Sequence, residues 1–230
     1  MVEYTPPEEL LFDYAAGTLP EPLALFVASH LTLAPGSRQE VKELEEVGGA
    51  LIEDLPPEDL SDRAMESLLA RLDEAETDLK VDETAPAGTP TPPASAGQAH
   101  DAAAVPHVLR SYIGASDYSR LPWKERGGNV AECSLLGDYP GFKTRLLRIK
   151  AGARVPSHTH QGREFTLVLQ GGFSDGIGHY LPGDVSTADN ETTHQPVADE
   201  DEDCICLAVT DAPLKMTGPL GRVLNFFVDI

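Results

Sequence analysis

The stretch "GARVPSHTHQGREFTLVLQG", residues 152–171, decides the fold of the C-terminal half. In an extended strand alternate side chains share a face, so His158 and His160 point the same way and can bind one ion together. Gly162 then allows the chain to turn, and Glu164 opens the next strand beside the histidine pair. The stretch predicts two short strands that bring three metal-binding side chains together.

A fourth candidate ligand, His194, closes the polar segment "DNETTH". It follows the turn signal "LPGD" and would come from a distant strand to complete a set of three histidines and one carboxylate. We expect one divalent metal in this half, with zinc as the first choice, although the ligand set itself suits Zn, Mn, Fe or Ni and does not choose among them. The alternative is that these residues are polar side chains on the surface of strands.

The spacing of these residues resembles two motifs of the cupin family. The first motif is a glycine, five residues, His-x-His, three residues, Glu, six residues and a glycine, and it matches from Gly152 to Gly171 at every defined position. The second is looser, because Pro182 and Gly183 are adjacent and the gap to His194 is longer. The resemblance implies a metal-binding cupin β-barrel.

The rest of the C-terminal half consists of short β-rich runs broken by turns: "FKTRLLRIKAG", "EFTLVLQGG", "CICLAVTD" and "LNFFVDI". No helical period of useful length occurs there, which favours an all-β sandwich or barrel. His107 and His179 lack the ligand spacing and are expected to face solvent. Cys133 is expected to serve packing only.

Four helices are predicted upstream. Thr5 with Glu8, and Ser37 with Glu40, have the capping-box spacing that opens the first and third helices. The second helix covers "PLALFVASHL", and the fourth follows "PPEDLSD". One side of the third helix should be lined by Val41, Leu44, Leu51 and Leu55.

A change of composition separates the two halves. Residues 81–106 are rich in Pro, Ala, Thr and Gly, with almost nothing large enough to bury, and are interpreted as a flexible linker. We therefore expect a helical domain at 1–80, the linker at 81–106 and a metal-binding β domain at 107–230. The fold class is α plus all-β in two domains.

The charge of the chain restricts its partners. It has 17 Lys and Arg against 38 Asp and Glu, a net charge of −21. Residues 1–80 carry 5 basic and 19 acidic side chains, which is a net −14. Such a chain would repel nucleic acid and anionic membranes, so we expect neither as a partner. The acidic end suits a basic protein, or it is only a solvated face.

The cysteine count and the apolar segments indicate the compartment. Three cysteines, an odd number, do not form a disulfide framework, which fits a reducing environment. No basic-then-apolar segment opens the sequence, and "LALFVASHLTLA" is too short and too polar to span a bilayer. The protein is therefore expected to be cytoplasmic.

The whole chain resembles the ChrR family of cupin-containing anti-sigma factors. The words "LLFDYAAGTL", "VASHLTL", "HQGREFTLVLQGGFSD" and "DCICLAVTDAPL" carry the resemblance, in the family's order and at similar spacing. It implies that the helical domain binds and sequesters an extracytoplasmic-function (ECF) sigma factor. It also implies that the cupin is the sensor through which stress releases that factor.

One departure concerns the zinc site that helical domains of this family usually contain. His30 is present, but Thr5, Ala34 and Ser37 stand at the other ligand positions, and a tetrahedral structural zinc needs four ligands. We expect no zinc there. The caps formed by Thr5 and Ser37 would replace part of its stabilisation, at about 1 kcal/mol each. His30 should then be an ordinary, partly exposed histidine.

Two further features bear on function. Cys204 and Cys206 share one face of a strand, and the resemblance associates this pair with the response to oxidants. Small core residues are the alternative, because free cysteine is commonly buried.

A partner surface is predicted on the fourth helix, with Glu66, Asp73 and Glu74 as its acidic rim. Its apolar face comprises Met65, Leu68, Leu69 and Leu72.

Two rival functions remain open. The same ligand set supports a cupin enzyme, such as a dioxygenase or isomerase, when a metal coordination position stays open. Beyond Arg163 and Tyr180, the sequence offers no separate acid, base or nucleophile near the motif. The other rival keeps the fold but gives the helical domain, which lacks the zinc ligands, no sigma factor at all. A non-enzymatic regulator is the preferred interpretation.

Overall fold

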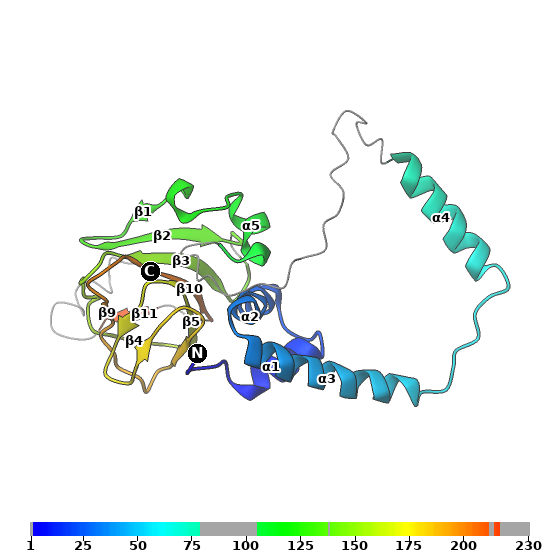
Figure 1. The fold of residues 1–230 in the computed structure, drawn as a ribbon, viewed down its shortest axis with the longest axis horizontal. Coiled ribbons are helices and arrows are strands. Elements are labelled where there is room, and N and C mark those ends of the chain that lie inside the picture. Colours follow the sequence, from blue (N-terminus) through cyan, green and yellow to red (C-terminus); the bar gives the residue numbers. More distant parts are fainter. Residues whose placement is uncertain (1, 79–104, 138, 212–213, 217–230) are drawn as a thin grey trace. The chain divides into compact units, whose positions relative to one another are not determined.

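The computed structural model divides the chain into two compact units (Figure 1). One unit combines Met1–Gly49 with Asp101–Ile230, and the other is Ala50–His100. This differs from the expected division between 1–80 and 107–230, because the first helices share one hydrophobic core with the β domain. The structure describes residues 2–78, 105–137, 139–211 and 214–216.

The C-terminal half is built from antiparallel strands. Among the described residues, the main sheet has the order β1 (Lys124–Glu125), β2 (Val130–Leu135), β3 (Lys143–Ile149), β10 (Cys204–Thr210), β5 (Glu164–Gln170) and β8 (Val185–Ala188). In a second sheet, β4 (His158–His160) pairs with β11 (Leu214–Met216). A third sheet has the order β7 (His179–Tyr180), β6 (Phe173–Ser174) and β9 (Val197–Ala198). The predicted fold class, helices followed by a cupin-type β domain, is confirmed.

The three apolar runs that were predicted as strands lie side by side at the centre of the main sheet. They form β3, β10 and β5, with β10 between the other two. Every residue of β10 is buried, which explains its nearly continuous apolar sequence. The fourth run, "LNFFVDI", lies outside the described residues.

The two faces of the main sheet carry different side chains. Leu146 and Leu207 are paired across β3 and β10 and are completely buried in the core that also includes the helices. On the opposite face, Glu132, Arg145 and Cys206 line an internal cavity. The alternation of side chains along each strand thus separates an apolar, helix-covered face from a partly charged interior.

Helix α2 (Glu21–Leu33) covers the apolar face of the sheet (Figure 1). Phe26 is completely buried, and its ring centre lies 6.0 Å from that of Phe165 on β5. Helix α1 (Glu8–Ala15) adds Leu11 to the same core. Burying one such aromatic side chain stabilises the fold by about 1.5–3 kcal/mol, so these helices are part of the barrel's own core.

A short helix, α5 (His107–Ile113), and a 3-10 turn, η1 (Tyr118–Arg120), precede the strands, where no helix was predicted. Leu109 anchors α5 in the common core, and Gly114, with φ of 64°, follows its last residue. The prediction of no helix in this half was wrong, because seven residues are too few to show a helical period. Most of the predicted linker, 81–106, lies outside the described residues.

The two predicted helix caps are wrong. Helix α1 begins only after Pro7, and no side chain in the described part of the chain caps it. Thr5 lies instead in an extended segment whose preceding residue, Tyr4, accepts a 2.9 Å hydrogen bond from the backbone N–H of Val185 on β8. Helix α3 (Pro35–Glu53) starts two residues before Ser37, so this serine is buried inside its first turn.

The predicted apolar side of α3 is only partly buried. Val41 is buried, whereas Leu51 and Leu55 are 65% and 64% exposed. The residues beyond position 49 belong to the second compact unit, which also contains α4 (Ala64–Asp78). Within the described ranges, no helix combines the length and the apolar character that a membrane span requires.

Candidate metal centre

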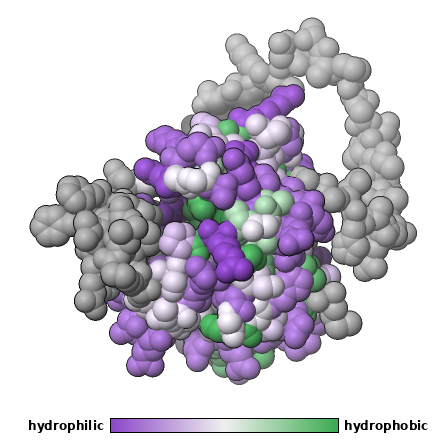
Figure 2. Space-filling view, turned by 90° about the vertical axis from the view of Figure 1, so that its left-hand side faces the viewer, coloured by the Kyte–Doolittle hydropathy of each residue, from purple (hydrophilic) through white to green (hydrophobic). Residues whose placement is uncertain are grey.

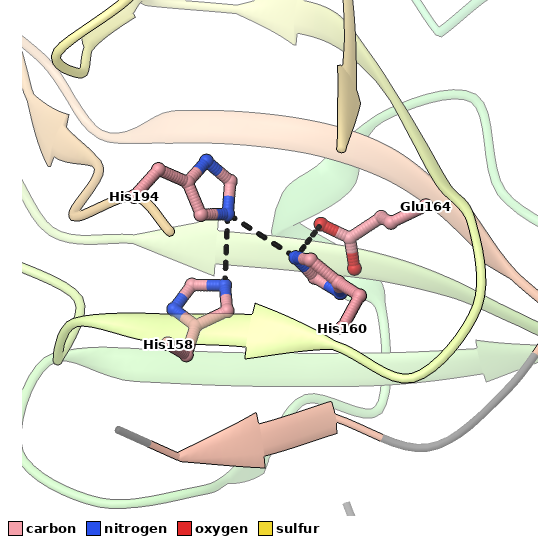
Figure 3. Close-up of side chains that lie close together, drawn as sticks. All are labelled: His158, His160, Glu164 and His194. Atoms are coloured by element: carbon pink, nitrogen blue, oxygen red, sulfur yellow. Dashed lines mark hydrogen bonds and ion pairs between the residues drawn. The ribbon is translucent and has the colours of Figure 1, made fainter. Parts of the chain in front are cut away.

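Three histidines and one glutamate meet inside the barrel (Figure 3). His158 and His160 come from β4, and Glu164 is the first residue of β5. His194 reaches them from a distant loop, because its backbone pairs with that of His158 through two 3.1 Å hydrogen bonds. All four are buried, and their ligand atoms lie within 4.8 Å of one another.

The nitrogen atoms that face the centre are spaced as metal ligands require. Nε2 of His194 lies 3.0 Å from Nε2 of His158 and 3.2 Å from Nε2 of His160. Nε2 of His160 is 3.8 Å from Oε1 of Glu164. Metal–nitrogen bonds of about 2.0–2.1 Å place neighbouring ligand atoms roughly 3 Å apart. This buried group could therefore bind one metal ion.

The outer nitrogen atoms orient two of the rings. Nδ1 of His158 lies 2.8 Å from the carbonyl oxygen of Pro156, which only accepts, so Nδ1 carries the hydrogen and Nε2 presents a lone pair. Nδ1 of His194 lies 3.2 Å from Oδ2 of Asp175, whose side chain is completely buried. Two nitrogen lone pairs at 3.0 Å repel each other unless a cation lies between them, so the donor set fits a metal.

Burial also favours the metal-binding form of the histidines. It lowers the pKa of His160 to about 4, and the charges of His158 and Arg145 act in the same direction. Burial and His158 lower the pKa of His194, although Asp175 partly opposes this. Both imidazoles are therefore neutral near neutral pH, as metal binding requires.

A cavity of about 430 Å³ adjoins the centre. His158, Glu164 and His194 form one part of its wall, and Glu132 and Arg145 form another. A volume of this size is within the range of small-molecule binding sites. The candidate metal centre thus faces an internal space rather than a packed core.

Sequence reasoning missed the charged wall of this cavity. Nη1 of Arg145 lies 3.6 Å from Oε2 of Glu132, and the other oxygen of this carboxylate, Oε1, accepts a 2.5 Å hydrogen bond from Arg126. Burial alone would raise the pKa of Glu132, but these two arginines hold it below its usual value. A signal was present, because Arg145 has the same strand parity as Leu147 and Ile149, which also face inward.

The two candidate redox cysteines lie together at the cavity. Sγ of Cys204 is 3.4 Å from Sγ of Cys206, both are buried, and Cys206 lines the cavity. The hydrogen bond with Cys204, burial and the nearby Glu164 all raise the pKa of Cys206. Cys206 is therefore held as a thiol near neutral pH, while Cys133 is packed in the core of the opposite face, as expected.

His30 corrects a prediction, because it is completely buried rather than partly exposed. Its Nε2 lies 2.8 Å from Oγ of Ser37 on α3, and its Nδ1 lies 2.9 Å from the carbonyl oxygen of Gly183 in the barrel. Ser37 thus contributes through its side chain, not as the predicted cap. The pair joins two helices to the turn before β8.

The remaining predicted residues lie outside the centre. His107 is exposed, and His179 is 51% exposed with its ring 2.8 Å from Asp199, as expected for solvent-facing side chains. Arg163 is exposed and contacts Asp211. Tyr180 is buried and stacks on Phe173 at 4.8 Å. Neither Arg163 nor Tyr180 belongs to the described wall of the cavity.

The predicted partner surface lies on α4 and is exposed. Its exposed fractions run from 51% to 67% over Met65, Leu68, Leu69 and Leu72, named here the α4 face. Glu66 of the expected acidic rim is exposed as well. The side chains of Asp73 and Glu74 lie outside those that the structure describes.

The chain is similar to known proteins over nearly its whole length. The family profile described as "ChrR Cupin-like domain" matches residues 114–213. The chain is 38% identical over 223 residues to the anti-sigma-E factor ChrR of Cereibacter sphaeroides, covering 97% of this chain and 96% of the relative. A crystal structure of Rhodobacter sphaeroides SigE in complex with the anti-sigma ChrR matches with a TM-score of 0.72 and 36% identity, covering 92% of this chain and 100% of that one.

Proposed function

The chain belongs to the ChrR family of anti-sigma factors with a cupin domain, and on this basis we propose that it inhibits transcription by binding an ECF sigma factor. The N-terminal helices would contact the sigma factor, and the cupin would sense the stress that releases it. The similarity over 97% of the chain carries the proposal, since it spans both the helices and the barrel.

The α4 face supplies the surface for this contact. Its four apolar side chains are spaced at i, i+3, i+4 and i+7, the pattern by which a helix lies in the groove of a partner. The 19 acidic and 5 basic side chains of residues 1–80 suit a basic partner. A sigma factor presents such a surface to DNA, so binding should weaken as salt rises.

The cupin is proposed to hold one divalent metal, most simply zinc, on His158, His160, Glu164 and His194. The opposed lone pairs of His158 and His194 support a cation at this position. A bound metal would supply positive charge and a tether between β4, β5 and the loop of His194. No zinc is proposed at His30, because both of its ring nitrogens have protein partners.

The cysteine pair is proposed as the oxidant-sensitive part of the sensor. Cys206 borders the cavity that the metal ligands also border, so an oxidant that enters the cavity reaches a sulfur atom. The two sulfur atoms are already 3.4 Å apart. Their burial is also what packing alone would produce, and replacement of each cysteine by serine separates the two roles.

Regulation is proposed in preference to catalysis. The cupin fold also serves enzymes, but the side chains that the sequence offered for chemistry, Arg163 and Tyr180, lie away from the described cavity wall. The rival interpretation, in which the N-terminal helices bind no sigma factor, is tested by the same binding experiment as the proposal.

The test is binding of the full-length chain to an ECF sigma factor of its own cell, identified by co-purification. The double variant Leu68→Asp/Leu69→Asp should weaken binding by about tenfold or more, because it places charges in the apolar contact. Both leucines are more than half exposed, so metal content and helicity should not change.

Ile177→Asp/Leu181→Asp is the matched control. It replaces an equally exposed apolar pair, at 61% and 47% exposure, on the barrel, and it should leave binding intact. The proposal fails if the native chain carries no sigma factor, and the assignment of the α4 face fails if the two double variants bind alike.

A further inference from the structure

The cavity beside the metal centre contains a buried positive charge without an adequate partner. The Arg145 side chain is 2% exposed, and its Nε has no hydrogen-bond partner among the described residues. Its contact with Glu132 is long, at 3.6 Å, whereas Arg126 binds the same carboxylate at 2.5 Å. Arg126 donates to Oε1 of Glu132, and Oε2 of the same carboxylate lies beyond hydrogen-bond distance of Arg145, so an added anion would complete the hydrogen bonding of this buried guanidinium group.

The charges around the cavity leave room for an added anion. Arg126 and Arg145 share Glu132, which leaves one net positive charge, and Arg154 in the same wall adds a second. Glu164 belongs to the metal ligands and does not offset them. In a chain of 17 basic and 38 acidic residues, three arginines around one cavity form a local exception.

Position separates the roles of the arginines. Arg126, with a side chain 48% exposed, and Arg154, which is also exposed, reach solvent and can attract an anion. Arg145 lies inside, where a planar guanidinium group can bind a carboxylate with two parallel hydrogen bonds.

The rest of the wall is apolar near Arg145. Leu147 and Ile149 follow it on the same face of β3, and Phe173 closes the cavity from β6. An inorganic anion would leave this apolar surface in contact with water. A ligand with an apolar body covers it and removes that surface from water.

We propose that the cavity binds a small organic carboxylate, with its carboxylate group on Arg145 and its apolar part against Leu147, Ile149 and Phe173. The ligand lies beside the wall formed by His158, Glu164 and His194. Binding is a property of the barrel and requires no sigma factor, so it can hold or fail independently of the anti-sigma proposal.

The test is calorimetric titration of the full-length, zinc-loaded chain with benzoate, and with benzyl alcohol as the neutral analogue. Benzoate should bind at least about tenfold more tightly, because a hydrogen-bonded charge pair is lost with the alcohol. Equal affinities would show an apolar cavity without anion recognition and would overturn the proposal, as would no benzoate binding.

Two variants test whether Arg145 provides the positive charge that binds benzoate. Arg145→Met should weaken benzoate binding by about tenfold or more. Arg148→Met removes an arginine from the same strand that contacts Trp123 and Glu125 instead, and should leave the affinity nearly unchanged. Equal losses in both would mean that only overall charge matters, which contradicts a specific site.

A measurement on the unmodified chain keeps the test valid if Arg145→Met does not fold. In ¹⁵N-labelled protein, the Nε–H signal of Arg145 should shift on addition of benzoate, because that hydrogen gains an acceptor. The Nε–H signal of Arg148 should stay in place. An unmoved Arg145 signal at saturating benzoate overturns the proposal.

Discussion

Nε2 of His30 lies 2.8 Å from the hydroxyl oxygen of Ser37, and both side chains are buried. Together with the bond to the Gly183 carbonyl, this contact links α2, α3 and the barrel. His30→Leu leaves both partners buried without a hydrogen bond and should lower the free energy of unfolding by about 1–3 kcal/mol in urea denaturation. Ser61→Ala, at an exposed position, should change it by less than about 0.5 kcal/mol.

The same histidine makes stability depend on pH. Burial lowers the pKa of His30 below 6.5, although the bond to Gly183 and the charge of Asp184 oppose this. Below that pH the unfolded chain binds a proton that the folded chain resists, so stability should fall as pH drops through about 6.5 toward the lower folded value. His160 and His194, whose pKa values are also lowered, add to the same slope, so His30→Gln should reduce this slope without removing it, and an unchanged slope would contradict the assignment.

The packing of α2 on the sheet predicts a large effect at Phe26. Phe26→Ala removes a completely buried ring beside Phe165 and should lower the free energy of unfolding by about 3–5 kcal/mol. Phe12→Ala on α1 is the matched control, because its ring is 59% exposed, and its effect should stay below about 0.5 kcal/mol. Similar losses would show that the helices do not share the barrel core.

Metal stoichiometry follows from the ligand set. Elemental analysis should find one metal per chain, and His158→Ala/His160→Ala should lose it completely, because half of the four ligands are removed. Two metals per chain would mean that residues near His30 bind the second one.

Asp175 should tune the metal without binding it. Its buried carboxylate lies 3.2 Å from Nδ1 of His194, so Asp175→Asn should weaken metal affinity by about 10–100-fold. Asp199→Asn is the control, because Asp199 makes the equivalent contact with the half-exposed His179. Chelator competition measures both, and equal affinities would contradict the role given to Asp175.

The cluster of candidate metal ligands was predictable because their spacing is local. His158, His160 and Glu164 lie within seven residues on two consecutive strands, so strand alternation alone brings them together. Asp175 was not predictable, since only the folded loop places it behind His194. The same holds for Arg145, whose meaning depends on a cavity shared by strands far apart in sequence.

The helical half shows where local rules fail. Thr5 and Ser37 have capping-box spacing, but tertiary contacts prevent both caps, because Tyr4, the residue before Thr5, bonds to Val185 on β8 and Ser37 pairs with His30. Leu10 and Leu11 are the buried residues of α1. An apolar helix face shows that a helix packs against something, but not against what. The pattern therefore could not reveal that these leucines pack against the sheet of the C-terminal half.

The backbone of Tyr4 occupies the open side of β8, the last strand of the main sheet among the described residues. Glu3 and Tyr4 are held there by Asp184, whose Oδ1 accepts both of their N–H groups. An unprotected outer strand is a template for pairing with another chain. The contact leaves less of this outer strand open to a second copy of the protein, so a chain that lacks residues 2–4 is expected to associate edge to edge more readily, even with its barrel folded.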